Sequence, residues 1–266
     1  MNFSYRTESI QTAALDLSYF LVPWDTEIFG KPVAQISTVR VIEPRQAALD
    51  YRAFADWCAQ QRIELCSCRV PADRLADSMF LEERGFRFIE LNYLPQLTDL
   101  QARRPSGVSG LRVVPADASN RDELADMAAQ VFRFGRLHQD PRVAPELGDR
   151  RYRAWMTNAF SHPRQHVLKC IQDRTIVAFF VLESPQPNHC FWSLIGLAPG
   201  LQGKGLGKQV WNAVLDHHRE QGVEVVSTSI SSLNVAVLNL YVSLGFRFPQ
   251  PSITLQWRPV GTAVLS

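Results

Sequence analysis

Apolar positions in the first hundred residues change between two spacings. Stretches in which apolar residues alternate with polar ones, or follow one another over a short run, predict strands, whereas apolar residues three and four apart predict helices. Pro, Gly and polar clusters mark the turns between them. The pattern predicts the order ββαβαβ, with strands at 19–24, 33–41, 63–71 and from 86, and helices at 44–62 and 72–84.

The rest of the chain continues this alternation. A polar stretch at 98–112, TDLQARRPSGVSGLR, has the Pro and Gly content of an exposed connection, so we predict a boundary at 101–110 and two domains, 1–105 and 106–266. Alternating strands and helices indicate an α/β domain with parallel pairing at its centre. The second domain is predicted to have strands at 111–116, 166–172, 175–183, 189–197, 223–231 and from 246, and helices at 117–132, 149–160, from about 205, and at 234–244.

The two halves share an internal repeat. Residues 61–88 align without a gap on residues 221–248, at a constant offset of 160 (221 − 61), and both segments end in GFRF. Both also carry Glu as the second residue of the predicted strand, at Glu64 and Glu224. Because strand, helix and glycine all coincide, we interpret the match as a structural duplication.

Composition narrows the class of protein. A chain of 266 residues with 46% hydrophobic and 20% charged residues is typical of a globular protein, and a net charge of +2 predicts neither a nucleic-acid partner nor a membrane-adhering face. The five cysteines lack the paired CxxC spacing of a zinc site, so we expect buried thiols, a reducing compartment and no metal. No leader-like start or membrane-span pattern is found, which predicts a cytoplasmic protein.

A glycine-rich loop between a predicted strand and helix carries the strongest chemical signal. The stretch at 201–210 reads LQGKGLGKQV. A dinucleotide fingerprint GxGxxG fails because Lys208 stands where its third glycine is needed. A Walker A loop fails because Gln202 and Gln209 occupy the positions of its first glycine and its Ser or Thr. Glycines at a helix start still expose backbone N–H groups to an anion, although they can also serve only a tight turn.

The spacing that remains, Gln202 to Gly207, fits [Arg/Gln]-x-x-Gly-x-Gly/Ala and resembles the GNAT superfamily of acetyl-CoA-dependent N-acetyltransferases. The resemblance extends to Asn234, Tyr241 and Gly245-Phe246 downstream. It implies that the loop binds the pyrophosphate of coenzyme A, that Asn234 bonds the pantetheine arm, and that Tyr241 protonates the departing thiolate. A half-buried core tyrosine is the structural alternative. The acetyl-CoA site implied in this way comprises Gly196, Leu197, Gln202, Gly203, Lys204, Gly205, Leu206, Gly207, Lys208, Asn234 and Tyr241.

The same resemblance implies the fold and the number of cofactor sites. We expect tandem GNAT-like domains: a degenerate N-terminal half-domain and a complete C-terminal acyl-CoA N-acyltransferase fold with a mixed central sheet. At the offset of 160, Gly205 aligns with Arg45, Asn234 with Arg74, and Tyr241 with Leu81. The N-terminal copy lacks the cofactor residues, so the chain is expected to bind one CoA.

The chemistry of amine acetylation leaves the general base unidentified. A tyrosine of ordinary pKa is protonated at neutral pH and can supply the leaving-group proton, and N–H groups near Gly196 and Leu197 are the expected donors to the thioester carbonyl. The predicted strand at 189–197 has no carboxylate, although many family members carry a base there. The candidates for this base are His189, His138 and a water relay. An acceptor amine of low pKa would need little help in losing its proton.

Two further stretches bear on the acceptor amine. VPWDTEIFGKPV at 22–33 and DRRYRAWMTNAF at 149–160 resemble the TDP-fucosamine acetyltransferase family, which implies a nucleotide-linked amino-deoxysugar as acceptor. Arginines at 133, 136 and 142 could pair with its diphosphate, although a solvated basic loop needs no ligand. Another small-molecule or protein amine, a non-catalytic CoA-binding module and a homodimer all stay open. The acceptor residues proposed are Arg133, Arg136, His138, Tyr152 and His189.

Overall fold

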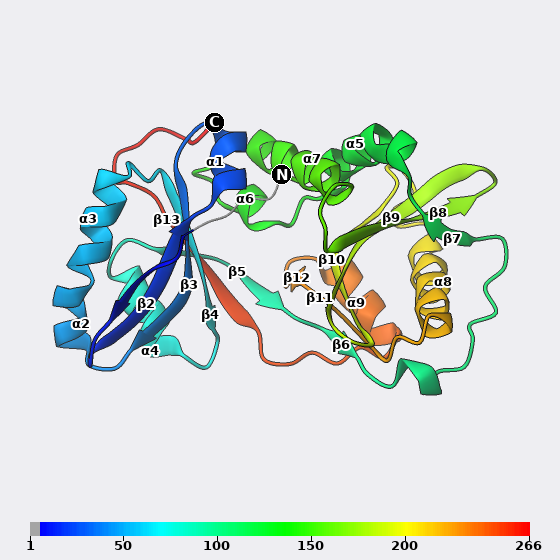
Figure 1. Ribbon diagram of the computed structural model, residues 1–266, viewed down its shortest axis with the longest axis horizontal. Coiled ribbons are helices and arrows are strands. Elements are labelled where there is room, and N and C mark those ends of the chain that lie inside the picture. The colour runs from blue at the N-terminus through cyan, green and yellow to red at the C-terminus, as the bar shows by residue number, and fades with distance from the viewer. Residues whose placement is uncertain (1–5) are drawn as a thin grey trace. The chain divides into compact units, whose positions relative to one another are not determined.

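The computed structural model describes residues 6–266, which form two compact units. The N-terminal unit contains residues 6–92, 135–147 and 250–266, and the C-terminal unit contains residues 93–134 and 148–249. Each unit is built on one sheet (Figure 1). The predicted α/β class is confirmed, but the predicted ranges 1–105 and 106–266 do not coincide with the two units.

The sheet of the N-terminal unit has the order β1-β2-β3-β4-β13-β5. Strands β3 and β4 run parallel, whereas β13 is antiparallel to both of its neighbours. The segment predicted to end a first strand at 24 instead forms a short helix, because Pro23 suits the first turn and Gly30 closes it at φ 64°. The elements of this unit are β1 (Glu8–Gln11), β2 (Leu15–Leu21), α1 (Pro23–Phe29), β3 (Val33–Val41), α2 (Pro44–Asp50), α3 (Arg52–Gln60), β4 (Leu65–Pro71), α4 (Leu75–Glu82), β5 (Arg87–Tyr93), α6 (Arg136–Gln139) and β13 (Ser252–Trp257).

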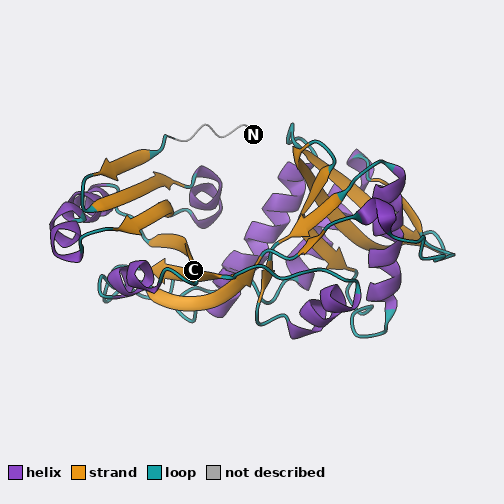
Figure 2. Ribbon diagram, turned by 90° about the horizontal axis from the view of Figure 1, so that it is seen from below, coloured by secondary structure: helices purple, strands orange, loops and turns teal. Residues whose placement is uncertain are grey.

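The sheet of the C-terminal unit has the order β6-β11-β10-β9-β8-β7, and only β10 and β11 are parallel. Helices cover both faces: α8 and α9 pack on one, α5 and α7 on the other (Figure 2). The elements are β6 (Gln96–Leu97), η1 (Leu100–Ala102), β7 (Arg112–Pro115), η2 (Ala118–Asn120), α5 (Arg121–Val131), α7 (Pro145–Ala159), β8 (Gln165–Gln172), β9 (Thr175–Gln186), β10 (His189–Leu197), α8 (Leu206–Glu220), β11 (Val225–Thr228), β12 (Ile230–Ser231) and α9 (Val235–Ser243).

An exchange of strands overturns one prediction. The strand expected from Phe246 does not form there; the chain runs on to β13, which lies between β4 and β5 of the N-terminal unit (Figure 1). In the C-terminal unit the edge beside β11 is filled by β6, where Leu97 pairs with Val226. This edge is therefore supplied by a strand that lies just before the predicted linker, and not by the last strand of the chain.

The predicted linker is also bonded along its length to the C-terminal unit. The Gln101 amide donates to two carbonyls at the end of α8 and just beyond it, and the Arg103 guanidinium donates to Leu244 O at 2.8 Å and Asn212 Oδ1 at 2.9 Å. Ser106 donates to the Asp216 carboxylate. The predicted exposed connection is confirmed for 101–106, where every residue but Arg103 is exposed, and its polar side chains also cap and bridge α8 and α9.

The backbone confirms the internal repeat. Strand β4 begins at Leu65 and β11 at Val225, and the helices that follow begin at 75 and 235. The residues before those helices share a conformation, with φ −100° and ψ 56° at Arg74, and φ −85° and ψ 63° at Asn234. Both helices end at a glycine of positive φ, 89° at Gly85 and 86° at Gly245. Sequence offset and backbone geometry therefore agree residue for residue.

The predicted buried thiols are also observed. All five cysteines are buried and free, and burial raises the pKa of Cys58, Cys68, Cys170 and Cys190 to about 12. Within residues 6–266 no helix is long and apolar enough to cross a membrane. Over the same residues, no group of three or more His, Cys, Asp or Glu side chains is arranged to hold a metal ion.

Candidate functional site

The glycine loop forms an open cradle at the start of α8. Gly203 and Gly205 have φ values of 74° and 79°, a region that glycine enters without steric cost. A Cβ built at either position meets no atom within 4 Å, so the space above the loop is empty of protein. No side chain caps the helix at Gly205, and Lys204 and Lys208 are exposed beside it. Free N–H groups, the helix dipole and two cations favour an anion here.

Strands β10 and β11 diverge next to this cradle. They pair only from His189 with Val225 to Trp192 with Thr228, after which β10 continues to Leu197 against β9 alone. Ala198 N–H donates to Val177 O on the β9 side. Since peptide groups alternate along a strand, the Leu197 N–H and the Ile195 carbonyl face the side that β11 has left. This edge offers one donor and one acceptor to an extended amide chain.

Tyr241 lies in the core at the point of divergence. Its side chain is 2% exposed and packs against the rings of Phe246 and Trp211, with centroids 4.8 and 6.5 Å away. The pKa of Tyr241 is raised to about 12, because the effect of burial exceeds the lowering by the Trp211 and Thr228 side chains. Thr228 is the last residue of β11 that pairs with β10, so the phenol reaches the start of the open edge. The hydroxyl is kept protonated at neutral pH.

Asn234 and Gly196 have structural partners. The Asn234 side chain caps α9 by accepting from Val237 N–H at 3.4 Å. Gly196 pairs with Phe179 of β9, so its peptide groups belong to that ladder and not to the open edge. A Cβ at Gly196 would lie 2.6 Å from Phe179 Cζ, which explains the glycine by packing. Of the two carbonyl donors expected on β10, the geometry therefore favours Leu197 and disfavours Gly196.

The two candidate bases are separated. His189 Nε2 lies 2.7 Å from Ser227 Oγ across the paired part of β10 and β11. Its position is four residues from Ser193, where the strands part, or about 13 Å along a strand. His189 would therefore need a water chain to reach the start of the open edge. His138 belongs to α6 of the N-terminal unit.

The arginines proposed to bind a diphosphate have carboxylate partners within their own units. In the C-terminal unit Arg133 pairs with Asp149. In the N-terminal unit Arg136 lies 3.4 Å from Asp25, whose side chain is 1% exposed, and Arg142 contacts Asp140 through two nitrogens. Sequence spacing could not reveal these partners, because Asp25 and Arg136 lie 111 positions apart.

Tyr152 is part of an aromatic stack. Its ring lies 4.2 Å from Phe132 at an interplanar angle of 21°, and 6.4 Å from Trp155 at 6°. Arg151 covers the Trp155 ring at 5.2 Å. The position of Tyr152 on α7 is explained by packing between α7 and the end of α5.

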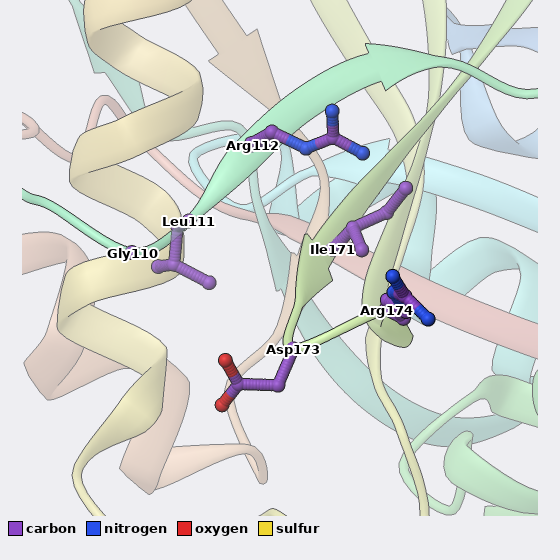
Figure 3. Close-up of a pocket in the computed structure, with 6 residues that line it drawn as sticks. All are labelled: Gly110, Leu111, Arg112, Ile171, Asp173 and Arg174. Carbon is purple, nitrogen blue, oxygen red and sulfur yellow. The ribbon is translucent and has the colours of Figure 1, made fainter.

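A shallow hollow lies apart from the glycine loop. It has a volume of about 440 Å³ and is drawn in Figure 3. Its lining comes from the start of β7 and from the turn between β8 and β9, and it includes none of the residues expected to hold a cofactor. Its charged side chains are exposed to solvent, so we do not place the site there.

Comparison with known proteins agrees with this geometry. Residues 126–246 match the family model described as "Acetyltransferase (GNAT) family". A stretch of 53 residues is 40% identical to mycothiol acetyltransferase of Renibacterium salmoninarum, and one of 64 residues is 41% identical to L-amino acid N-acyltransferase MnaT of Escherichia coli. These stretches cover 20% and 24% of this chain but only 16% and 34% of the two relatives.

Solved structures match over nearly the whole chain. A tandem GNAT protein from the clavulanic acid biosynthesis pathway has a TM-score of 0.60 at 15% identity, over 92% of this chain and 79% of the other. A GCN5-related N-acetyltransferase from Sphaerobacter thermophilus has a TM-score of 0.64 at 11% identity, over 96% and 84%. At such identities the likeness establishes the tandem fold.

Proposed function

We propose that this chain, whose residues 126–246 match the GNAT acetyltransferase family model, transfers an acetyl group from acetyl-CoA to the amine of a small molecule. One observation carries the proposal: the uncapped glycine loop and the open edge of β10 adjoin, with a protonated tyrosine where the strands part. An anion cradle, an amide-pairing edge and a proton donor are the three features that a thioester of CoA requires.

The residues of the cleft fit the cofactor. The loop from Gly203 to Gly207 would hold the pyrophosphate through backbone N–H groups, with Lys204 and Lys208 adding charge. The Leu197 N–H and the Ile195 carbonyl would pair with the pantetheine amides. The empty space above Gly203 and Gly205 supports this fit, because bulk there would exclude a phosphate. The bound cofactor supplies an activated acetyl thioester.

The chain's own groups account for two parts of the reaction. Tyr241 holds a proton at its hydroxyl and can donate it to the leaving sulfur. The free N–H of Leu197 can stabilise charge on the carbonyl oxygen. In the described residues β10 carries no carboxylate, so the amine has to arrive uncharged or lose its proton to water, with His189 as the nearest titratable partner on that strand.

The acceptor in this proposal is the amine of a small molecule. A nucleotide-linked amino-deoxysugar is the narrower candidate, supported by the sequence stretches at 22–33 and 149–160. The internal partners of Arg133 and Arg136 weaken the case for a diphosphate at those side chains. The name of one relative refers to L-amino acids, which favours testing that class as well. The alternatives are another amine, such as an antibiotic or a protein N-terminus, and a non-catalytic CoA-binding module.

A free-thiol assay with acetyl-CoA tests the proposal. The panel of amines contains TDP-4-amino-4,6-dideoxyhexoses, L-amino acids, aminoglycosides and a peptide N-terminus. We expect amine-dependent thiol release, reduced at least a hundredfold in Tyr241→Phe with the dissociation constant for acetyl-CoA unchanged. Tyr51→Phe, which removes another buried hydroxyl at the position equivalent to Trp211, is the matched control. Binding of acetyl-CoA without turnover on any amine would favour the non-catalytic module.

A further inference from the structure

A second aromatic side chain adjoins the Tyr241 hydroxyl. Trp211 of α8 is 4% exposed, and its Nε1–H has no hydrogen-bond partner of good geometry among residues 6–266. Its ring meets the Tyr241 ring edge-on, with centroids 6.5 Å apart, and the Trp211 and Thr228 side chains both lower the pKa of the phenol. Thr228 donates its own proton to Trp192 O at 2.8 Å, so its oxygen can accept from the phenol.

This arrangement favours a phenolate over a neutral phenol. A neutral phenol that donates to Thr228 can still accept from the indole N–H, but a hydrogen bond to a charged oxygen is shorter and about twice as strong. Once Tyr241 loses its proton, a neighbouring N–H therefore stabilises its oxygen more. Donors aimed at the atom where charge develops stabilise the transition state more than the ground state. In the N-terminal copy these three positions carry Tyr51, Cys68 and Leu81.

We propose that Trp211 is a positioning residue whose indole N–H stabilises the Tyr241 oxygen as Tyr241 protonates the leaving sulfur. This inference rests on the proposed function. In the step, the amine nitrogen bonds to the acetyl carbon, the carbon–sulfur bond breaks with its electron pair going to sulfur, and the Tyr241 proton forms the S–H bond. The proton lost by the amine returns to the Tyr241 oxygen through solvent, which restores the phenol.

Trp211→Phe keeps the ring and removes the donor. We expect kcat to fall about tenfold to a hundredfold while KM for acetyl-CoA stays the same. In the Tyr241→Phe background the same substitution is expected to have no further effect on kcat, because the oxygen it acts on is gone. Tyr51→Phe again serves as control. An unchanged kcat in Trp211→Phe, or losses that multiply in the double variant, would overturn the proposal.

A second measurement needs no turnover. Incorporation of a fluorotyrosine at position 241 lowers the pKa of that phenol enough for titration by ¹⁹F NMR in the full chain. Trp211→Phe is expected to decrease its ionisation constant about tenfold, since one donor to the phenolate is lost. An unmoved ionisation constant in a folded variant would refute the proposal even if the wild-type chain releases no thiol. Absence of thiol release by the wild type would instead count against the proposed function.

The N-terminal unit carries an independent second inference. Its parallel strands β3 and β4 pair up to Ile36 and Cys68 and then part, as β10 and β11 do after Trp192 and Thr228. Ile42 N–H donates to Ala14 O on the β2 side, just as Ala198 N–H donates to the β9 side. The strand pairing therefore equates Val39 and Val41 of β3 with Ile195 and Leu197 of β10, at an offset of 156 (192 − 36) and not the 160 of the sequence repeat, because the loop after β10 is longer.

Side chains of the N-terminal unit occupy that edge. The Arg74 guanidinium, at the position of Asn234, donates to Val39 O at 2.8 Å, and Asp77 accepts from Val41 N–H at 2.7 Å. Asp77 is 3% exposed and pairs with Arg74 at 2.5 Å. Glu43 accepts from Gln46 N–H at 2.7 Å at the start of α2, where the other copy has its glycine loop.

We infer that the N-terminal unit is a cofactor cleft closed by its own side chains. Arg74 and Asp77 replace the amides of a pantetheine arm, and the Glu43 carboxylate replaces a phosphate at the helix start. The inference rests on the proposed function for the identity of the displaced ligand. It explains chemically why a copy with the same backbone would take no CoA.

Hydrogen exchange of the full chain tests the closure. Amides of residues 38–43 are expected to be protected without ligand and to exchange about tenfold faster in Asp77→Ala, whereas those of 194–199 become protected only when acetyl-CoA is added. Gly205→Glu, which leaves the N-terminal unit intact, is expected to remove all CoA binding in calorimetry. Protection of 38–43 by acetyl-CoA, or a CoA site that survives in Gly205→Glu, would overturn the closure. If the wild-type chain binds no CoA, the proposed function is refuted. The hydrogen-exchange rates of Asp77→Ala still test the closure in that case.

Discussion

Acidification is expected to weaken the fold through one buried histidine of the C-terminal unit. His218 of α8 is 4% exposed, and its Nε2 accepts from the Trp192 indole N–H at 2.9 Å. Burial lowers the pKa of His218 to about 3, and the neighbouring His217 lowers it further. Protonation would place an uncompensated charge in the core and remove the acceptor that Trp192 uses.

The sign and size follow from the two pKa values. The unfolded chain binds a proton at His218 below pH 6.5, whereas the folded chain does so only near pH 3. Between these values the unfolded state carries more protons, so the free energy of unfolding falls as the pH falls. At about 1.36 kcal/mol per pH unit, a shift to pH 5 removes about 2 kcal/mol, and the loss is complete near pH 3.

Urea unfolding between pH 7 and pH 5 measures this loss. His218→Gln keeps an acceptor for Trp192 but cannot titrate, so its unfolding free energy is expected to fall by about 2 kcal/mol less than that of the wild type over this range. His166→Gln, which removes an exposed histidine of β8, is the control and is expected to follow the wild type. Parallel curves for His218→Gln and the wild type would refute the reasoning, since other groups titrate equally in both.

Three further substitutions test the site and the packing. Gly205→Glu is expected to abolish acetyl-CoA binding in calorimetry without loss of fold, because it places a carboxylate in the anion cradle. The control is Arg45→Glu, at the equivalent position of the other unit, which is expected to bind acetyl-CoA like the wild type. Gly196→Ala is expected to lower the free energy of urea unfolding by about 1–3 kcal/mol, because its Cβ collides with Phe179, and an unchanged unfolding curve would contradict that packing. The Leu265 side chain is 4% exposed in the core of the N-terminal unit, so Leu265→Ala is expected to lower the free energy of unfolding by about 2–4 kcal/mol. A loss below about 0.5 kcal/mol would show that Leu265 does not anchor that core.

Local patterns predicted the parts of the fold that depend on local physics. The bounds of β3 and β10 agree with the alternation of apolar and polar positions, and the repeat aligned β4 and α4 with β11 and α9. The helix predicted at 44–62 is interrupted near Tyr51, and α1 was missed, because a seven-residue helix has too few apolar positions to show a period. The loop at 201–210 could be interpreted because glycine spacing constrains the backbone directly.

The remaining features depend on contacts between distant residues. The apolar run at 252–257 predicts a strand but not its partners, and nothing local indicates that it enters the other sheet. Arg74 could be aligned with Asn234, but its bond to β3, and that of Asp77, required the structure. The contact of the Trp211 and Tyr241 rings also required the structure, because the two residues lie 30 positions apart (241 − 211).

The exchange of strands explains why a unit without a cofactor cradle can be essential to the chain. Strand β13 is central in the N-terminal sheet, where Leu255 and Gln256 are fully buried, so that sheet is divided if β13 is removed. Asp140 holds this strand in place: it accepts from Gln256 Nε2 at 2.8 Å and pairs with Arg142, which in turn donates to Gln256 O. The C-terminal sheet likewise depends on β6 from the segment after β5. Neither sheet is complete in one half of the sequence, so loss of the cofactor cradle in the N-terminal copy leaves its structural contribution intact.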